Sequence, residues 1–250
     1  MTPATQARTR HVEHCMGTVF SIDVRDTGNW DDAVAEVVTW LHEVDAVFST
    51  YRPDSDISRM GRGELTLRGA HPEVATVLDL SAQIQLETDG AFSAVTDRRL
   101  DPTGLVKGWA VERASRLLRA RGSRNHLVNG GGDVQLSGEA APGRPWTVGI
   151  TDPHDSTTVL TTVCGQDFAV ATSGTAERGA HIRDPYTGRA VTGVASASVT
   201  GPSLTFADAF ATAVFVKGDR GCRWIEGIPG YEALVVLADG TVTASSGWGA

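Results

Sequence analysis

The stretch SLTFADAFATAVFVKG, residues 203–218, is a helical pattern with apolar side chains on nearly every side. A helix that is apolar all round is buried on all sides rather than laid on a surface. The fold must therefore surround it with other elements. Inside the pattern, Asp208 and Thr212 stand four residues apart, so they share one helix face.

Asp208 has two interpretations. The spacing Thr205-x-x-Asp208 has the form of a capping box with Asp in place of Glu or Gln, and the helix dipole favours a carboxylate near this end. A carboxylate and a hydroxyl on one buried face are also oxygen donors of the kind that a hard cation such as Mg²⁺ prefers.

Around this helix the sequence predicts elements of both kinds. Helical spacing of apolar residues predicts helices at 31–48, 72–88 and 108–121. Short apolar or alternating runs separated by Gly-rich turns predict strands, and a terminal hairpin turns at Asp239-Gly240. The strands are expected within residues 17–24, 125–138, 145–151, 157–165, 168–174, 195–201 and 232–246. This mixed order favours an α+β fold over a doubly wound parallel sheet. We expect a flexible lead over residues 1–10 and one domain over residues 11–250.

Composition narrows the class of protein. The chain has 250 residues and a formal net charge of −8, which argues against nonspecific binding to nucleic acid or anionic membranes. The three cysteines lack a C-x-x-C spacing, so a disulfide framework is not expected. The N-terminal residues have no apolar signal-peptide core, and no apolar run is long enough to span a bilayer. We therefore expect a cytoplasmic protein.

Two further motifs have a structural and a functional interpretation. The run VNGGGDV, residues 128–134, predicts either a tight turn between strands or a nest of backbone N–H groups that binds an anion. Lys107 stands near the expected start of a helix, where the dipole does not favour a cation. It is either a surface lysine or a partner to an anion bound at that helix end.

Histidines raise two possibilities. His181 lies in an apparent turn and suits either a structural hydrogen bond or the abstraction of a hydroxyl proton. His11, Glu13, His14 and Cys15 contain zinc-ligand types, but no matching second pair accompanies them. No Rossmann glycine motif or complete P-loop is present, so a nucleotide site of those kinds is not predicted.

Taken in order, nine stretches resemble the FAD:protein FMN transferase family, also called ApbE-like. They run from Met16 to Gly218 and read MGTVFSIDV, FSTYRPDSDIS, TDGAFSAVT, LDPTGLVKGWAVERA, LVNGGGDV, PWTVGI, ATSG, HIRDPYTG and ADAFATAVFVKG. The resemblance implies an α+β fold with a flavin cleft between sheet and helices. It also implies transfer of FMN from FAD, with Mg²⁺, to a Thr or Ser hydroxyl of an acceptor protein, with release of AMP. FAD hydrolysis to FMN and AMP, or flavin binding without catalysis, are the alternatives.

The resemblance assigns roles to individual residues. Asp208, Thr212 and the backbone carbonyl of Gly104 correspond to metal ligands, and on this ground we prefer the metal role of Asp208. His181 corresponds to the base that deprotonates the acceptor. Positions where relatives contact FAD are Met16, Tyr51, Ala91, Phe92, Ser93, Asp101, Lys107 and Arg183.

The chain also departs from the family pattern. Ser93 replaces an acidic residue of many relatives, Asp56 stands where Glu is usual, and Arg183 takes a commonly aliphatic place. Many relatives are exported lipoproteins, whereas Cys15 does not lie in a lipobox. We therefore expect an acceptor in or facing the cytoplasm.

Overall fold

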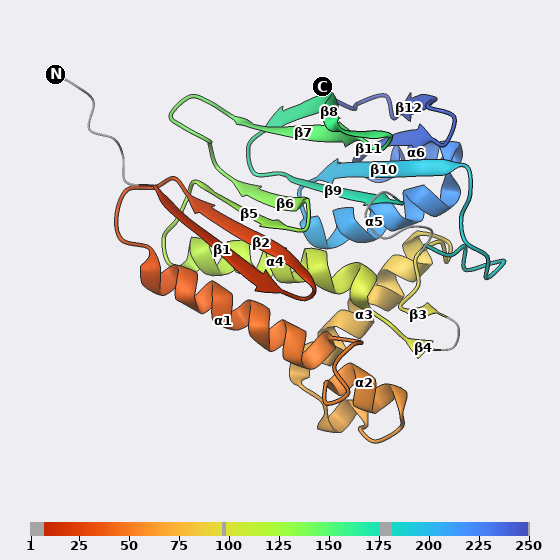
Figure 1. The fold of residues 1–250 in the computed structure, drawn as a ribbon, viewed down its shortest axis with the longest axis horizontal. Helices are drawn as coiled ribbons and strands as arrows, with labels where there is room; N and C mark the ends of the chain where they lie inside the picture. The colour runs from red at the N-terminus through yellow and green to blue at the C-terminus, as the bar shows by residue number, and fades with distance from the viewer. Residues whose placement is uncertain (1–7, 97–98, 176–181, 250) are drawn as a thin grey trace.

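A computed structural model describes residues 8–96, 99–175 and 182–249. Its centre is an eight-stranded sheet in which every neighbouring pair is antiparallel, with strand order β1-β2-β5-β6-β9-β10-β11-β12 (Figure 1). These strands are β1 (Thr9–Cys15), β2 (Thr18–Val24), β5 (His126–Gly130), β6 (Asp133–Ser137), β9 (Ala169–Gly174), β10 (Val194–Gly201), β11 (Glu232–Leu237) and β12 (Val242–Ala244). The predicted α+β class is confirmed.

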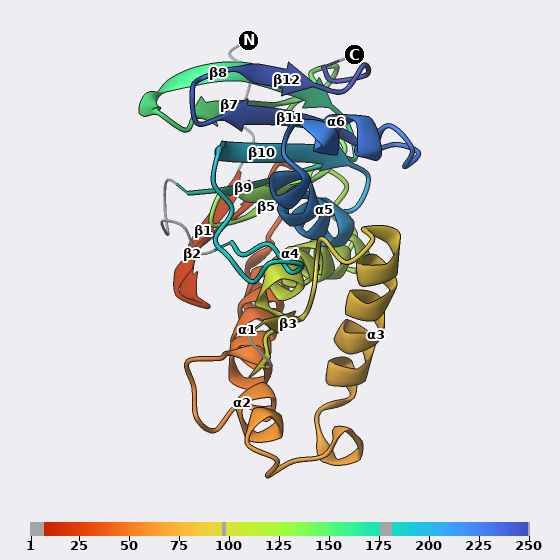
Figure 2. The same cartoon turned by 90° about the vertical axis from the view of Figure 1, so that its right-hand side faces the viewer.

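Helices cover one face of this sheet and a hairpin covers part of the other (Figures 1 and 2). The helices are α1 (Asp31–Phe48), α2 (Asp56–Gly61), α3 (Pro72–Glu87), α4 (Thr103–Ala120), α5 (Leu204–Lys217) and α6 (Asp219–Ile225), with a short 3₁₀ turn at Leu67–Gly69. The covering hairpin pairs β7 (Trp146–Asp152) with β8 (Asp155–Gly165), and β3 (Val95–Thr96) pairs with β4 (Arg99–Leu100). Figure 2 shows α1, α2 and α3 extending away from the sheet.

The main core lies between the sheet and the helices. Helix α5 is at its centre, with Phe210 and Phe215 essentially inaccessible to solvent. A second apolar cluster, including Leu136, Trp146 and Ile150, fills the space beneath the β7–β8 hairpin. The expectation that residues 203–218 form a helix buried on all sides is confirmed.

Helix α4 starts earlier than predicted. It begins at Thr103 rather than near Gly108, because the Asp101 carboxylate accepts the Thr103 N–H at 3.1 Å and its hydroxyl at 2.6 Å. Lys107 is thus in the second turn of the helix, not at its end. The short helix α2 was not predicted; it lies in the polar segment 49–64, and its start is capped by Ser55.

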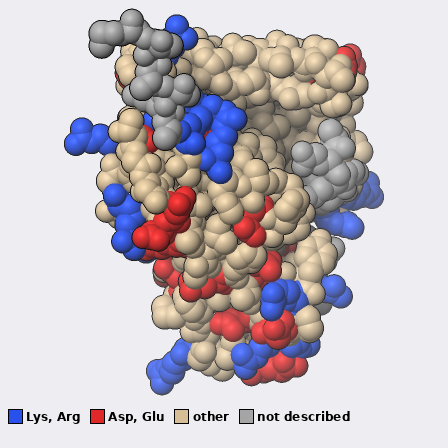
Figure 3. All heavy atoms as spheres, turned by 60° about the vertical axis from the view of Figure 1, so that its left-hand side comes forward, with Lys and Arg blue, Asp and Glu red and all other residues tan. Residues whose placement is uncertain are grey.

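The first strand also starts earlier than the expected end of the flexible lead. Thr9 and Arg10 belong to β1, where Arg10 pairs across the ladder with Asp23. Asp23 holds this end of the strand because Arg8, Arg10 and Arg25 all form ion pairs with it. Figure 3 shows basic side chains gathered on this side of the molecule.

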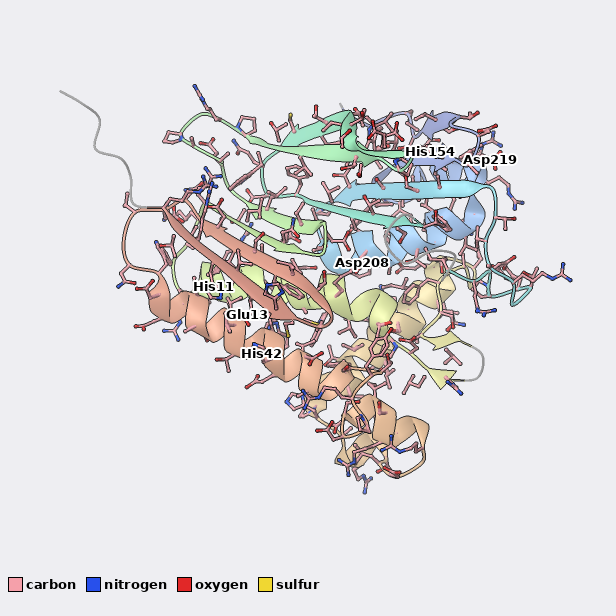
Figure 4. The ribbon with its side chains drawn as sticks, viewed as in Figure 1. His11, Glu13, His42, His154, Asp208 and Asp219 are labelled. Carbon is pink, nitrogen blue, oxygen red and sulfur yellow. The ribbon has the colours of Figure 1, made fainter. Side chains whose placement is uncertain are left out.

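His11 of β1 and His42 of α1 form a cluster around the Glu13 carboxylate rather than a metal site. Glu13 Oε2 lies 3.0 Å from His11 Nε2, and Glu13 Oε1 lies 3.0 Å from His42 Nε2 on α1. Figure 4 shows this cluster apart from Asp208. Within the described residues no group of three His, Cys, Asp or Glu side chains is arranged to hold a metal ion, so the zinc alternative is not supported. In the same ranges no helix combines the length and apolar composition needed to cross a bilayer.

Candidate functional site

Asp208 is held against α4 by the backbone of Gly108. Its Oδ2 atom accepts the Gly108 N–H at 2.9 Å inside the core. Helices α4 and α5 approach closely here because position 108 has no side chain. A Cβ atom on Gly108 would lie 2.6 Å from the Leu204 carbonyl oxygen and 2.7 Å from Asp208 Cβ.

The capping-box interpretation of Asp208 is wrong. The Thr205 N–H donates to Glu112 Oε2 of α4 at 2.9 Å. The same oxygen accepts hydrogen bonds from the Ser203 and Thr205 hydroxyls at 2.5 Å each. The Leu204 N–H donates to Gln135 Oε1 at 2.9 Å. Because Glu112 and Gln135 accept the N–H groups at the start of α5, the Asp208 carboxylate does not cap this helix.

Lys107 lies between two carboxylates. Its Nζ atom contacts Asp133 Oδ2 at the start of β6 and lies 3.8 Å from Asp208 Oδ1. Both carboxylates are buried, and the second oxygen of Asp133 accepts the Thr172 N–H of β9 at 2.9 Å. Sequence reasoning did not single out the side chain of Asp133. Its only signal was its place directly after the glycine run.

The glycine run itself forms the turn of a hairpin, as the structural interpretation predicted. Gly131 and Gly132 both have positive φ angles, 59° and 94°, and join β5 to β6. Their N–H groups are already engaged, by the Val19 carbonyl at 3.0 Å and by Asn129 Oδ1 at 3.1 Å. The tight-turn interpretation is therefore confirmed, the anion-binding nest is not supported, and the motif places Asp133 at the start of β6.

Thr212 and Gly104 complete the set predicted as metal ligands. The Thr212 hydroxyl lies 3.2 Å from Ser173 Oγ of β9 and 3.5 Å from the Asp208 carbonyl one turn earlier. Gly104 lies in the first turn of α4, four residues before Gly108. A backbone carbonyl oxygen has two lone pairs, so the Gly104 carbonyl can accept a helical hydrogen bond and still take another partner.

Burial is the main influence on Asp208. It raises the pKa of this carboxyl to about 7, with a further rise from Asp133 and an opposing effect from the Lys107 ammonium. When both carboxylates are ionised, the cluster of Lys107, Asp133 and Asp208 has one negative charge more than positive. Carboxylate, hydroxyl and carbonyl oxygens around a surplus negative charge fit a hard divalent cation such as Mg²⁺.

The residues predicted to contact FAD are not equally accessible. Met16 forms a two-residue turn with Gly17 between β1 and β2, and Tyr51 is 96% exposed after α1. Ala91 and Phe92 are buried, and a Cβ atom on Gly104 would lie 3.3 Å from the Phe92 ring, so Phe92 supports the start of α4. A contact between the buried Phe92 side chain and FAD is therefore not supported.

Ser93 and Asp101 bond locally. The Ser93 hydroxyl accepts the Val95 N–H at 3.1 Å and donates to the Val95 carbonyl at 3.0 Å. Asp101 accepts the N–H of Thr103, the first residue of α4. These contacts give both residues a structural role in the segment that leads into α4. A role toward FAD stays a prediction.

The segment 182–190 is fastened to the end of α3. Its exposed Arg183 donates to the Gly188 carbonyl at 2.9 Å, and the Tyr186 hydroxyl donates to the Asp89 carbonyl. Tyr186 was missed in the sequence, although an aromatic residue inside a tight polar turn is the available signal. His181, the predicted base, lies outside the described residues.

Comparison with known proteins shows which family the chain resembles. The model named "ApbE family" matches residues 16–98 and 93–235. An FAD:protein FMN transferase of Treponema pallidum is 33% identical over 214 residues, which is 78% of this chain and 57% of that protein. One of Rhodobacter capsulatus is 30% identical over 236 residues, which is 88% of this chain and 41% of that protein. The chain thus spans about half the length of these relatives.

A solved structure shows the same fold. The flavin transferase ApbE from Vibrio cholerae superposes with a TM-score of 0.82 at 25% identity, covering 96% of this chain and 97% of that one. The resemblance drawn from the nine motifs is confirmed, as is the α+β fold that it implied.

Proposed function

Because the chain belongs to the ApbE family, we propose that it is a Mg²⁺-dependent FAD:protein FMN transferase. The observation that carries the proposal is the buried carboxylate of Asp208, released from helix capping by Glu112 and joined to the start of α4 by Gly108. A carboxylate kept in the core without a capping duty suits a ligand role.

In the proposed reaction, the hydroxyl oxygen of an acceptor Thr or Ser attacks the FMN-side phosphorus of FAD. The bond from that phosphorus to the bridging oxygen breaks, AMP leaves with the bridging oxygen, and the hydroxyl proton passes to a base. His181 is the residue proposed as that base. The product is a phosphoester between FMN and the acceptor.

The described residues have defined tasks in this scheme. Asp208, Thr212 and the Gly104 carbonyl would hold Mg²⁺, which when bound neutralises pyrophosphate charge and polarises the phosphorus. Lys107 supplies an ammonium beside the same place, where it stabilises charge that grows on the phosphoryl oxygens. Tyr51, Met16 and Arg183 stay proposed flavin contacts, and Tyr51 is exposed as such a contact requires.

The compartment proposed is the cytoplasm. Cys15, Cys164 and Cys222 are all unpaired, as is usual in a reducing environment. Fractionation of the native host, with the chain followed by antibody, tests this part of the proposal.

The test of function is a mass spectrum of an acceptor peptide with Thr in an Asp-Gly-Ala-Thr context, incubated with the protein, FAD and Mg²⁺. AMP is assayed in parallel. A mass gain of one FMN phosphoryl group is expected, and it should vanish in Asp208→Asn but persist in Asp79→Asn, a change at an exposed position of α3. AMP without adduct would reassign the site to FAD hydrolysis. Absence of both products would reduce the protein to a flavin binder.

A further inference from the structure

The side chain of Asp133 is fixed, whereas that of Lys107 is long and flexible. Asp133 Oδ1 is bonded to the backbone of Thr172 at 2.9 Å, and its side chain is 2% exposed. The other oxygen, Oδ2, contacts Lys107 Nζ. The lysine reaches this point from α4, so the location of its ammonium depends on which carboxylate holds it.

The second carboxylate within reach of Lys107 is Asp208. Its Oδ1 atom lies 3.8 Å from the ammonium, a distance at which the two charges attract without a hydrogen bond. Its Oδ2 atom is already occupied by the Gly108 N–H at 2.9 Å. Oδ1 is therefore the oxygen through which Asp208 would bind a cation, and an ammonium that moved onto it would compete with that cation.

We propose that Asp133 is a positioning residue that holds the Lys107 ammonium beside Asp208 but off its Oδ1 atom, so that a divalent cation can bind there. The inference rests on the proposed function, since it assigns the ammonium a place next to the cation and the FAD pyrophosphate. Without the Asp133 charge, the Lys107 ammonium is attracted to the Asp208 carboxylate 3.8 Å away and moves onto it.

The experiment measures Mn²⁺ binding without FAD, from the loss of the free-ion signal in electron paramagnetic resonance. Asp133→Asn keeps the shape of the side chain and an oxygen for the Thr172 N–H, but lacks the charge. It is expected to weaken Mn²⁺ affinity about tenfold. Lys107→Met removes the competing ammonium and is expected to tighten Mn²⁺ binding at least threefold.

The double variant distinguishes positioning from a general structural effect. If Asp133 acts through Lys107, Asp133→Asn combined with Lys107→Met should recover an affinity within about threefold of the wild type. A double variant as weak as Asp133→Asn would overturn the proposal. Unchanged affinity in Asp133→Asn would do the same, as would a wild-type protein that binds no Mn²⁺. If Asp133→Asn fails to fold, the Lys107→Met result decides alone, and weaker binding there overturns the proposal.

These outcomes are independent of the chemistry. A wild-type protein that yields neither AMP nor adduct, yet shows the expected Mn²⁺ affinities, would refute the transferase and leave the role of Asp133 intact. If the protein is a transferase but its Mn²⁺ affinity is unchanged in Asp133→Asn, the proposed function stands and the role of Asp133 is refuted.

Discussion

Glu112 Oε2 on α4 accepts the backbone N–H of Thr205 on α5 at 2.9 Å. One turn away the relationship is reversed, since Asp208 on α5 accepts the N–H of Gly108 on α4 at 2.9 Å. Each helix thus gives a carboxylate to the backbone of the other. Together these two bonds fix the register between the helix that contains Gly104 and the helix that contains Asp208 and Thr212.

The first prediction concerns this register. Glu112→Gln replaces charge-assisted hydrogen bonds by neutral ones and is expected to lower the free energy of unfolding by about 2 kcal/mol at pH 7. Urea denaturation measures the change. Glu43→Gln, at an exposed position of α1, is the matched control and should shift the unfolding free energy by less than about 0.5 kcal/mol. Equal effects of the two substitutions would contradict the role of Glu112.

The loss should depend on pH. Burial alone would raise the pKa of Glu112, but hydrogen bonds from Ser203 and Thr205, with the charge of Arg116, outweigh it and hold the pKa below its usual range. A lowered folded pKa gives stability that is present above the unfolded value and is lost as pH falls through the folded one. The gap between wild type and Glu112→Gln should therefore narrow in acid. A gap that stays constant down to pH 3 would refute this account.

The second prediction tests the close approach of the two helices. Gly108→Ala places a Cβ atom 2.6 Å from a backbone oxygen, so the helices must separate. We expect a loss of about 3 kcal/mol in unfolding free energy and weaker Mn²⁺ binding. The control is Gly61→Ala in α2, where a Cβ atom meets nothing within 4 Å. If Gly108→Ala is as stable as Gly61→Ala, the contact does not limit the approach.

The third prediction concerns the pH dependence of cation binding. Because burial raises the pKa of Asp208 to about 7, the carboxyl is mostly protonated at pH 6 and mostly ionised at pH 8. Mn²⁺ affinity should fall about tenfold from pH 8 to pH 6. Without metal, the protein should lose stability as pH rises over that range, since the folded state holds the proton more tightly than the unfolded chain. Asp208→Asn should show neither trend, and a flat profile in the wild type would rule out Asp208 as the ligand that titrates.

The fourth prediction concerns the tie between segment 182–190 and α3. Tyr186→Phe removes the hydroxyl that donates to the Asp89 carbonyl and frees the segment that contains Arg183. FAD affinity, measured by quenching of flavin fluorescence, should fall about threefold to tenfold, which corresponds to one hydrogen bond of about 1 kcal/mol. Because Tyr186 is exposed, the unfolding free energy should change by less than about 0.5 kcal/mol. Val242→Ala on β12 should leave FAD affinity unchanged. Unaltered FAD affinity in Tyr186→Phe would show that the tie is not part of the flavin site.

Local pattern was enough to predict part of this site. Asp208 and Thr212 share a helix face because of their spacing, and the bounds of α1 at Asp31 and Phe48 follow from apolar periodicity. The start of α4 was predicted late because the residues Asp101 to Gly104 resemble a turn, whereas the Asp101 side chain in fact accepts the N–H of Thr103, the first residue of a helix. Asp is frequent both at helix N-termini and in turns, so the local sequence alone does not distinguish the two structures.

The remaining residues of the site are defined by contacts between distant segments. Asp133 meets Lys107 across 26 residues, Glu112 meets Thr205 across 93, and Tyr186 meets Asp89 across 97. These contacts cannot be predicted from the periodicity of residues within one helix or strand. Gly108 is a similar case. In the sequence a glycine indicates weak helix propensity, but in the structure its lack of a side chain lets α4 pack closely on α5.

The bond between Gly108 and Asp208 spans 100 residues of chain, which bears on how the protein is made. On the ribosome, α4 and the strands β5 to β10 are synthesised before any of α5. A nascent chain that stops short of residue 204 therefore contains Lys107 and Asp133 but not Asp208, and it lacks the central helix of the core. The proposed cation site therefore cannot form until α5 has been synthesised and has packed against α4, so bound metal would mark chains in which the two helices have docked.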